Sequence, residues 1–294
     1  MTRRINTIVI PAAGRGTRLL PATRVTAKEM LPVYDTPMLQ FAMDEAAATG
    51  AARVIIVISP DKLAIRDYLV PPNAQPSHSA DLTNLRRPET VEVVFAYQNK
   101  PLGLGHAIAC ARGLMLPGPF GVILPDDVIL GALCLPEMAR AYTGGHMVAA
   151  MEVPAAETSR YGIFRELGAA DGRRMAASGM VEKPKAGTEP SLLAAVGRYI
   201  LDPSIFATLD QTRIGAGGEM QLTDAINVDA ERLALTAFRF SGRRYDCGCL
   251  DGLLEAAIAR QDELRNPAMK SAVVPANHGI RPTLNLLETQ RARA

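Results

Sequence analysis

Apolar positions along the chain follow two alternating patterns. Short, largely β-branched runs predict buried strands, at Ile5–Ile10, Arg53–Ser59, Val91–Ala96 and Phe120–Leu124. Apolar residues three or four positions apart predict helices between these runs, at Asp61–Leu69 and Gly105–Met115. Another helix is expected to begin at Thr36 and Pro37, as N-cap and first-turn residue, and to end at Gly50. Strands that alternate with helices in this way indicate a mostly parallel sheet covered on both faces.

The pattern changes after about Met151. The turn-forming sequence GAADGRR separates Tyr161–Leu167 from Met175–Glu182, which predicts a β-hairpin. The remaining elements are expected as strands at Ala195–Leu201 and Leu235–Tyr245, and as helices at Pro203–Asp210, Glu219–Arg232 and Asp251–Leu264. The predicted fold class is α/β, with a Rossmann-like mixed, mostly parallel sheet flanked by helices and a small β-rich part.

The chain of 294 residues is long enough for one large domain or about two smaller ones. We find no internal repeat and no clear linker, and we expect one domain over residues 1–265. Two segments have a composition that predicts poor packing, the proline-rich Pro71–Thr90 and the C-terminal stretch. We expect residues 266–294 to form a tail that is either flexible or an oligomer contact.

Composition excludes several classes of protein. A net charge of +2 argues against a general nucleic-acid binder, so any anionic ligand must be held by locally placed cations. Apolar runs such as Val54–Ile58 are too short to cross a bilayer, and the N-terminus resembles a signal peptide poorly. The four cysteines include only one close pair, Cys247 and Cys249, and reduced thiols in a cytoplasmic protein are expected.

A glycine-rich turn after the first strand is the first candidate for chemistry. Bare backbone N–H groups in such a turn can approach a phosphate. The spacing after Gly14 does not fit a P-loop, and Leu19 stands where the dinucleotide fingerprint requires glycine. The turn alone is compatible with a plain strand-to-helix connection as well as with a phosphate site.

The segment GRGTRLLPATRVTAKEMLPVYDTPMLQFAMDEA, which begins at Gly14, resembles the signature of sugar-1-phosphate nucleotidylyltransferases, and in particular of those that use UTP. Further landmarks of that family follow in order: PLGLGHA, LPDD, YGI, VEKP, GRYIL, GGEMQLTDAI and YDCG. The resemblance implies an enzyme that converts UTP and glucose 1-phosphate into UDP-glucose and pyrophosphate with Mg²⁺. It implies a nucleotidyltransferase domain with a sugar-binding β-rich part, and no nucleic acid or membrane partner. A homo-oligomer is expected.

The same resemblance implies a role for individual residues. Both reactants are polyanions, so catalysis is largely alignment and charge neutralisation. The expected catalytic cations are Arg18 and Lys28. The expected nucleotide-binding positions are Ala12, Ala13, Gly14, Gly16, Gln98 and Gly105. The expected sugar-phosphate positions are Gly162, Glu182, Lys183 and Gly197. The expected ligands of Mg²⁺ are Asp126 and Asp246, with Asp127 in a supporting role.

Two positions depart from the family pattern. Where the family has lysine and tyrosine after its DCG sequence, this chain has Leu250 and Leu253. Because leucine offers no cation to a phosphate, we expect another cation, with Lys183 the nearest by motif, to replace the lysine. Three alternatives stay open: another sugar phosphate, dTTP in place of UTP, and a weakly catalytic regulatory paralogue.

Overall fold

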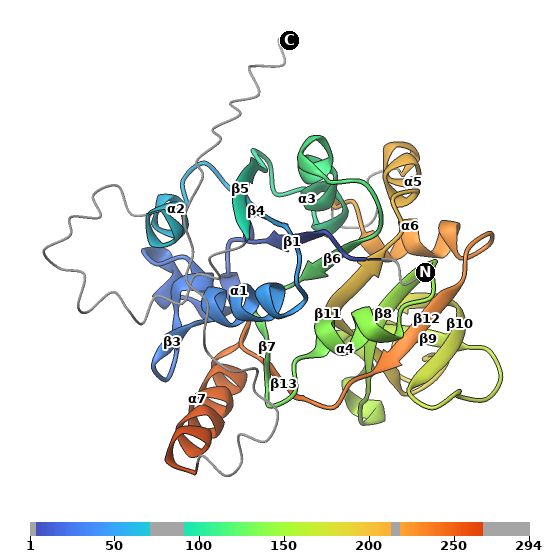
Figure 1. The fold of residues 1–294 in the computed structure, drawn as a ribbon. Coiled ribbons are helices and arrows are strands. Elements are labelled where there is room, and N and C mark those ends of the chain that lie inside the picture. The colour runs from blue at the N-terminus through green and yellow to red at the C-terminus, as the bar shows by residue number, and fades with distance from the viewer. Residues whose placement is uncertain (1–3, 71–90, 213–217, 267–294) are drawn as a thin grey trace, which may run out of the picture.

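Within residues 4–70, 91–212 and 218–266, which the computed structural model describes, nine strands form one mixed sheet at the centre of the protein (Figure 1). Their order across the sheet is β5 (Glu92–Tyr97), β4 (Arg53–Ile58), β1 (Thr7–Pro11), β6 (Phe120–Ile123), β11 (Leu193–Leu201), β8 (His146–Glu152), β12 (Leu235–Arg239), β10 (Arg174–Glu182) and β9 (Gly162–Glu166). The segment Pro71–Thr90 and residues 267–294 lie outside the described residues.

The sheet changes character halfway across. β5, β4, β1 and β6 are parallel to one another, as expected for strands joined by helical crossovers. β11 is antiparallel to both β6 and β8, whereas β8 and β12 are parallel. The predicted hairpin is confirmed, since β9 and β10 pair antiparallel, and it continues the same sheet. The predicted mixed sheet is therefore confirmed, with its unbroken parallel run in the N-terminal half.

Helices cover both faces because successive strand residues point to opposite sides. Ile8 and Ile10 of β1 pack on the side of α1 (Met38–Ala48), α2 (Leu63–Leu69) and α4 (Cys134–Ala141). Val9 lies on the opposite side, with α3 (Leu104–Ala111), α5 (Ile205–Gln211) and α6 (Leu222–Asp229). Each face of the sheet therefore has its own apolar core.

A smaller unit stands beside the main sheet. β7 (Asp127–Leu130) pairs antiparallel with β13 (Arg243–Asp246), and α7 (Leu250–Arg265) follows directly. A short hairpin of β2 (Pro32–Val33) and β3 (Thr36–Pro37) lies against α7. Figure 1 shows α7 and β13 apart from the helices that cover the sheet. In the described part of the chain, no helix has the length and apolar character needed to span a bilayer.

Three predicted boundaries are wrong. The single strand Leu235–Tyr245 is two strands in different sheets, because Ser241 and Gly242 turn the chain between them and a Cβ on Gly242 would clash with the backbone of Ala132. Thr36 and Pro37 form β3, so they do not open the helix, and Pro37 caps it without a side-chain hydrogen bond. α6 begins at Leu222, three residues after Glu219.

Candidate active site

A cavity of about 510 Å³ opens where the two halves of the sheet meet. Seven of the residues expected from the sequence line it: Arg18, Asp126, Gly162, Glu182, Lys183, Gly197 and Asp246. These positions are far apart in the chain but converge because β6, β9, β10 and β13 end or begin at this place and the middle of β11 passes along it. Ligands in open α/β sheets commonly bind at such strand ends.

Asp126 and Asp246 are brought together by the small β7–β13 ladder. Asp246 is paired in register with Asp127, the residue after Asp126, and the Cys247 N–H donates to the Asp126 carbonyl at 2.8 Å. A Cβ on Gly248 would stand 3.0 Å from one carboxylate oxygen of each aspartate. The Arg18 guanidinium contacts the same position, so the missing Cβ lets Arg18 lie beside the two carboxylates.

This donor set fits a hard divalent cation. Magnesium is commonly held by one or two carboxylates together with substrate phosphates and water. In the described part of the chain no group of three or more His, Cys, Asp or Glu side chains could hold a metal ion, so the protein would supply only Asp126 and Asp246. The pair Cys247 and Cys249 has no such cluster either, and all four cysteines are free thiols.

Lys28 lies directly against Asp126. Its Nζ is 2.6 Å from Asp126 Oδ2, and the two side chains are 16% and 18% exposed. Burial, the largest single influence, lowers the pKa of Lys28, but the carboxylates of Asp126 and Glu29 together outweigh it, and the net pKa is raised. Burial is also the largest single influence on Asp126 and raises its pKa, but Lys28, a backbone hydrogen bond and Arg18 together outweigh it, so the net pKa is lowered. Both groups are therefore charged at neutral pH.

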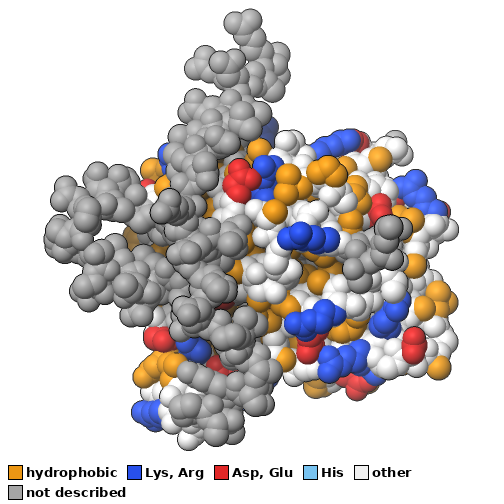
Figure 2. Space-filling model, viewed as in Figure 1, with side chains coloured by type: hydrophobic (Ala, Val, Ile, Leu, Met, Phe, Trp, Pro, Cys, Tyr) orange, Lys and Arg blue, Asp and Glu red, His pale blue; other side chains and the backbone are white. Residues whose placement is uncertain are grey.

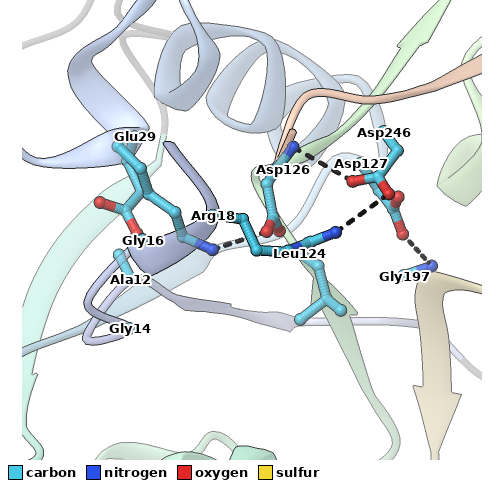
Figure 3. Close-up of polar contacts among 12 residues, drawn as sticks. Ala12, Gly14, Gly16, Arg18, Glu29, Leu124, Asp126, Asp127, Gly197 and Asp246 are labelled. Carbon is cyan, nitrogen blue, oxygen red and sulfur yellow. Dashed lines mark hydrogen bonds and ion pairs between the residues drawn. The ribbon is translucent and has the colours of Figure 1, made fainter. Parts of the chain in front are cut away.

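The glycine-rich turn packs on the side chain of Lys28. Gly16 has φ of +65°, and a Cβ there would stand 3.1 Å from the Lys28 Cβ and from the Thr23 methyl group. The Thr23 hydroxyl donates to the Gly16 carbonyl at 2.8 Å. Ala12 and Ala13 are buried at the end of β1, whereas Gly14 is exposed. The predicted turn thus lies beside a fixed ammonium group (Figure 3).

Three arginines gather around Asp246, of which the sequence analysis identified only Arg18. The Arg18 and Arg160 guanidiniums lie 3.3 and 3.1 Å from Asp246 Oδ2. Arg244 pairs with Asp127 and donates to the Tyr161 hydroxyl at 2.9 Å. Arg160 and Arg244 directly precede the YGI and YDCG landmarks. This position next to a recognised motif is the sequence signal that could have identified them as site residues.

Asp127 has the supporting role expected of it. Its Oδ2 accepts the Gly197 N–H at 2.7 Å (Figure 3). Its Oδ1 pairs with Arg244. A Cβ on Gly197 would stand 2.5 Å from Asp127 Oδ2 and 2.7 Å from the Leu124 Cβ, so only glycine allows this approach. The contact fixes β11 against the end of β6.

The sugar side of the cavity is built more loosely. Glu182 Oε2 accepts a hydrogen bond of 2.8 Å from Thr223, a residue that the sequence analysis missed. Lys183 lies 3.8 Å from Glu182, and its side chain is 64% exposed. Its φ of 44° is in the left-handed region, which turns the backbone sharply where β10 ends. A Cβ on Gly162 would stand 3.2 Å from Glu182 Oε2.

Two of the expected nucleotide-binding residues are engaged elsewhere. Gln98 is buried and donates from Nε2 to the Gly103 carbonyl at 3.1 Å, and Nε2 also lies 3.0 Å from His106. The Gly105 N–H donates to the Met220 carbonyl at 2.9 Å. Neither residue lines the cavity described above. Their contacts hold the start of α3, and a role in reading the base stays a prediction.

Leu250 does not line the cavity. It is the first residue of α7, with 57% of its surface exposed. Leu253 packs in the apolar cluster under β7 and β13. The cavity receives its cations from Arg18, Arg160, Lys183 and Arg244.

The chain is similar to known proteins over nearly its whole length. The family described as "Nucleotidyl transferase" matches residues 7–263. A UTP–glucose-1-phosphate uridylyltransferase of Bacillus subtilis is 36% identical over 95% of this chain and 98% of its own. One of Pseudomonas aeruginosa is 40% identical over 86% of this chain and 94% of its own.

Solved structures agree with the sequence comparison. A crystal structure of UDP-glucose pyrophosphorylase complexed with UDP-glucose gives a TM-score of 0.81 at 37% identity, covering 88% of this chain and 99% of that one. A UTP-bound UGPase of Acinetobacter baumannii gives a TM-score of 0.79 at 32% identity, covering 91% and 96%. The likeness extends over most of the fold.

Proposed function

The chain belongs to the nucleotidyl transferase family, and from this premise we propose that it makes UDP-glucose and pyrophosphate from UTP and glucose 1-phosphate. The observation that carries the proposal is a cavity lined by Asp126, Asp246 and Glu182, in which Asp126 is paired with Lys28 at 2.6 Å. One end of this cavity has groups for a triphosphate and the other has groups for a sugar.

The reaction is a substitution at the α-phosphorus of UTP. A phosphate oxygen of glucose 1-phosphate forms the new bond, the bond to the bridging oxygen of the β-phosphate breaks, and pyrophosphate leaves with that oxygen. No protein nucleophile is required, so the protein must align two anions and offset their charge. Lys28 is already charged and partly buried, and it therefore offsets developing negative charge without rearrangement.

Asp126 and Asp246 would hold Mg²⁺ beside Gly248, where the Arg18 guanidinium lies in the structure. When bound, the ion supplies positive charge that offsets the phosphates. In the structure Lys28 pairs with Asp126, and Arg18 and Arg160 pair with Asp246. Arg18 and Arg160 can turn from Asp246 to a phosphate, because the exposed side of each guanidinium remains available.

On the opposite side, Glu182 would accept hydrogen bonds from sugar hydroxyls while Lys183 pairs with the sugar phosphate. Thr223 holds one oxygen of Glu182 and so orients the carboxylate. Gly162 and Gly197 let the strands approach the hexose closely. The nucleotide would lie over Ala12, Ala13, Gly14 and Gly16, with Gln98 and Gly105 beyond them.

A grid of substrates tests the proposal. Pyrophosphate release is measured for five nucleoside triphosphates, dTTP included, with several hexose 1-phosphates and with Mg²⁺ varied. We expect the highest kcat/KM for UTP with glucose 1-phosphate. A higher value for dTTP or for another sugar phosphate would reassign the substrate, and negligible turnover in every well would support the regulatory paralogue.

Three broader expectations belong to the same proposal. We infer one nucleotidyltransferase domain over residues 1–265 and a tail over 266–294, in line with the family match to residues 7–263. A cytoplasmic location is supported by the free state of all four cysteines. Figure 2 shows Lys and Arg scattered over the visible face, with Asp and Glu among them. The homo-oligomer stays a prediction for size measurements in solution.

A further inference from the structure

Lys62 makes three contacts that the reaction described above does not use. Its Nζ donates to the carbonyls of Ala12 and Gly14, at 2.7 and 2.6 Å, and to Glu29 Oε2 at 2.7 Å. An ammonium group has three donors, and here all three are used. Two of the acceptors belong to the glycine-rich turn, and the third belongs to the residue beside Lys28.

This group of contacts is buried under the turn. The Lys62 side chain is 11% exposed and that of Glu29 is fully buried. Glu29 Oε1 is buried without a hydrogen-bond partner. Burial lowers the pKa of Lys62 and raises that of Glu29, so removing this pair from water opposes its charged state. An interaction formed under these conditions fixes geometry more clearly than it adds stability.

The two carbonyl contacts determine which way the turn presents its amides. In a trans peptide, the C=O and the following N–H point in opposite directions. The carbonyls of Ala12 and Gly14 point at Lys62, so the N–H groups of Ala13 and Arg15 point away from it. Lys28 Nζ lies on the turn as well, 3.8 Å from the position of a Cβ on Gly14.

We propose that the Lys62–Glu29 pair is a positioning device for the triphosphate of the nucleotide, which orients the N–H groups of Ala13 and Arg15 and fixes the segment that carries Lys28. The inference rests on the proposed function, since it assigns a support to the same nucleotide site. Lys62 and Glu29 act through the turn and through Lys28, and neither is a catalytic residue.

The test is the double variant Lys62→Met/Glu29→Gln, which removes both charges and leaves no unpaired ion. The dissociation constant of UTP, measured by calorimetry without the second substrate, and the KM for UTP should both rise about tenfold or more, because charged hydrogen bonds that hold the turn are lost. The KM for glucose 1-phosphate should stay within about twofold, since the sugar side has its own supports.

Arg53→Met/Glu92→Gln is the matched control. Arg53 also bridges a carboxylate and a carbonyl, those of Glu92 and Leu114, at distances of 2.8 and 2.7 Å, but it lies at the other end of β4. This control should lower the melting temperature and leave UTP binding unchanged. If Lys62 had a purely structural role, both double variants would lower the melting temperature and leave UTP binding unchanged.

The variant Lys62→Arg separates charge from geometry. A planar guanidinium cannot place three donors on acceptors that converge on one point, so UTP binding should remain weakened. Full UTP affinity in a folded Lys62→Met/Glu29→Gln protein would overturn the inference while leaving the uridylyltransferase assignment intact. If the parent prefers another nucleoside triphosphate, that assignment fails, and the same binding measurement with the preferred nucleotide still decides the role of Lys62.

Discussion

The two sides of the cavity differ in how firmly their polar groups are held. On the nucleotide side, Lys28 and Asp126 are 16% and 18% exposed and are paired at 2.6 Å. On the sugar side, the Lys183 side chain is 64% exposed, Glu182 is 31% exposed, and the two lie 3.8 Å apart. The first arrangement is set before a ligand arrives, whereas the second can adapt to one.

This difference follows from what each side must recognise. Negative charge develops at the phosphates, where fixed groups stabilise a transition state without the cost of reorganisation. Sugar hydroxyls remain neutral throughout, and mobile acceptors and donors can meet them individually. We therefore expect substitutions on the nucleotide side to affect kcat and those on the sugar side to affect KM.

The largest effect is expected for Lys28→Ala. Loss of a preorganised cation should lower kcat on the order of 10²–10³-fold, with a smaller effect on nucleotide binding because the turn and Arg18 remain. Steady-state kinetics with both substrates measures this split. Arg24→Ala, an exposed cation of the same segment, serves as the control and should change little. An unchanged kcat for Lys28→Ala would remove this residue from catalysis.

Next in size is the response of Asp126→Asn and Asp246→Asn to Mg²⁺. Each should raise the half-saturating Mg²⁺ concentration on the order of 10- to 100-fold or more. Loss of a residue that only hydrogen-bonds to a metal ligand already lowers metal affinity by about that factor. Activity is titrated with Mg²⁺ at fixed UTP. Asp210→Asn removes an exposed carboxylate that pairs with Arg112 and should leave the titration unchanged. Parent-like dependence in Asp246→Asn would require another second ligand.

Glu182→Gln should act on the sugar side alone. An amide oxygen accepts a weaker hydrogen bond than a carboxylate, so the KM for glucose 1-phosphate should rise about tenfold while that for UTP stays near the parent value. Glu182 pairs with Gly162 at the start of β9, and Glu166→Gln at the end of the same strand is the control, which should leave both KM values unchanged. Equal changes in both KM values would contradict the division of the cavity into two sides.

Acid should weaken the half of the sheet that carries the sugar side. His146 Nε2 lies 3.0 Å from Asp229, and its Nδ1 accepts the Asp202 N–H at 3.2 Å, which fixes the neutral tautomer with the proton on Nε2. Burial lowers the pKa of His146 despite the opposing effect of Asp229. The unfolded chain therefore binds a proton more readily, and stability is lost as pH falls below about 6.5.

Urea unfolding between pH 7.5 and 5 measures this loss, which approaches about 1.4 kcal/mol per pH unit for one proton. His146→Gln keeps a donor for Asp229 and should flatten the dependence. His106→Gln is the comparison: burial also lowers the pKa of His106, but its side chain is only partly buried, so its loss should flatten the dependence less. An equally steep dependence in His146→Gln would contradict the assignment.

The smallest effect is expected for Leu250→Lys. Leu250 is outside the cavity lining, and four cations already stand there, so kcat/KM should change less than about threefold. Ile258→Lys, two turns further along the exposed side of α7, is the control. Rescue of a Lys183→Ala variant by Leu250→Lys would instead support the idea that these two positions substitute for one another.

Local sequence determined the elements and the motifs of this protein. The β-branched runs became β1, β4, β5 and β6. Of these, β1, β4 and β6 are buried on both faces, which is what a continuous apolar run predicts. The GAADGRR turn gave the β9–β10 hairpin. The motifs placed seven residues at one cavity, since strand ends gather functional groups at one edge of a sheet.

Only the tertiary structure decided which groups touch. Lys62 contacts the turn across 48 and 50 positions of sequence, and Arg244 meets Asp127 across 117. No local spacing encodes such pairs, because they depend on how β7, β13 and α2 pack against the sheet. The split of Leu235–Tyr245 into β12 and β13 has the same cause, since pairing with β8 and with β7 draws its two parts into different sheets. Local preference sets the elements, and long-range packing sets the partners of each polar group.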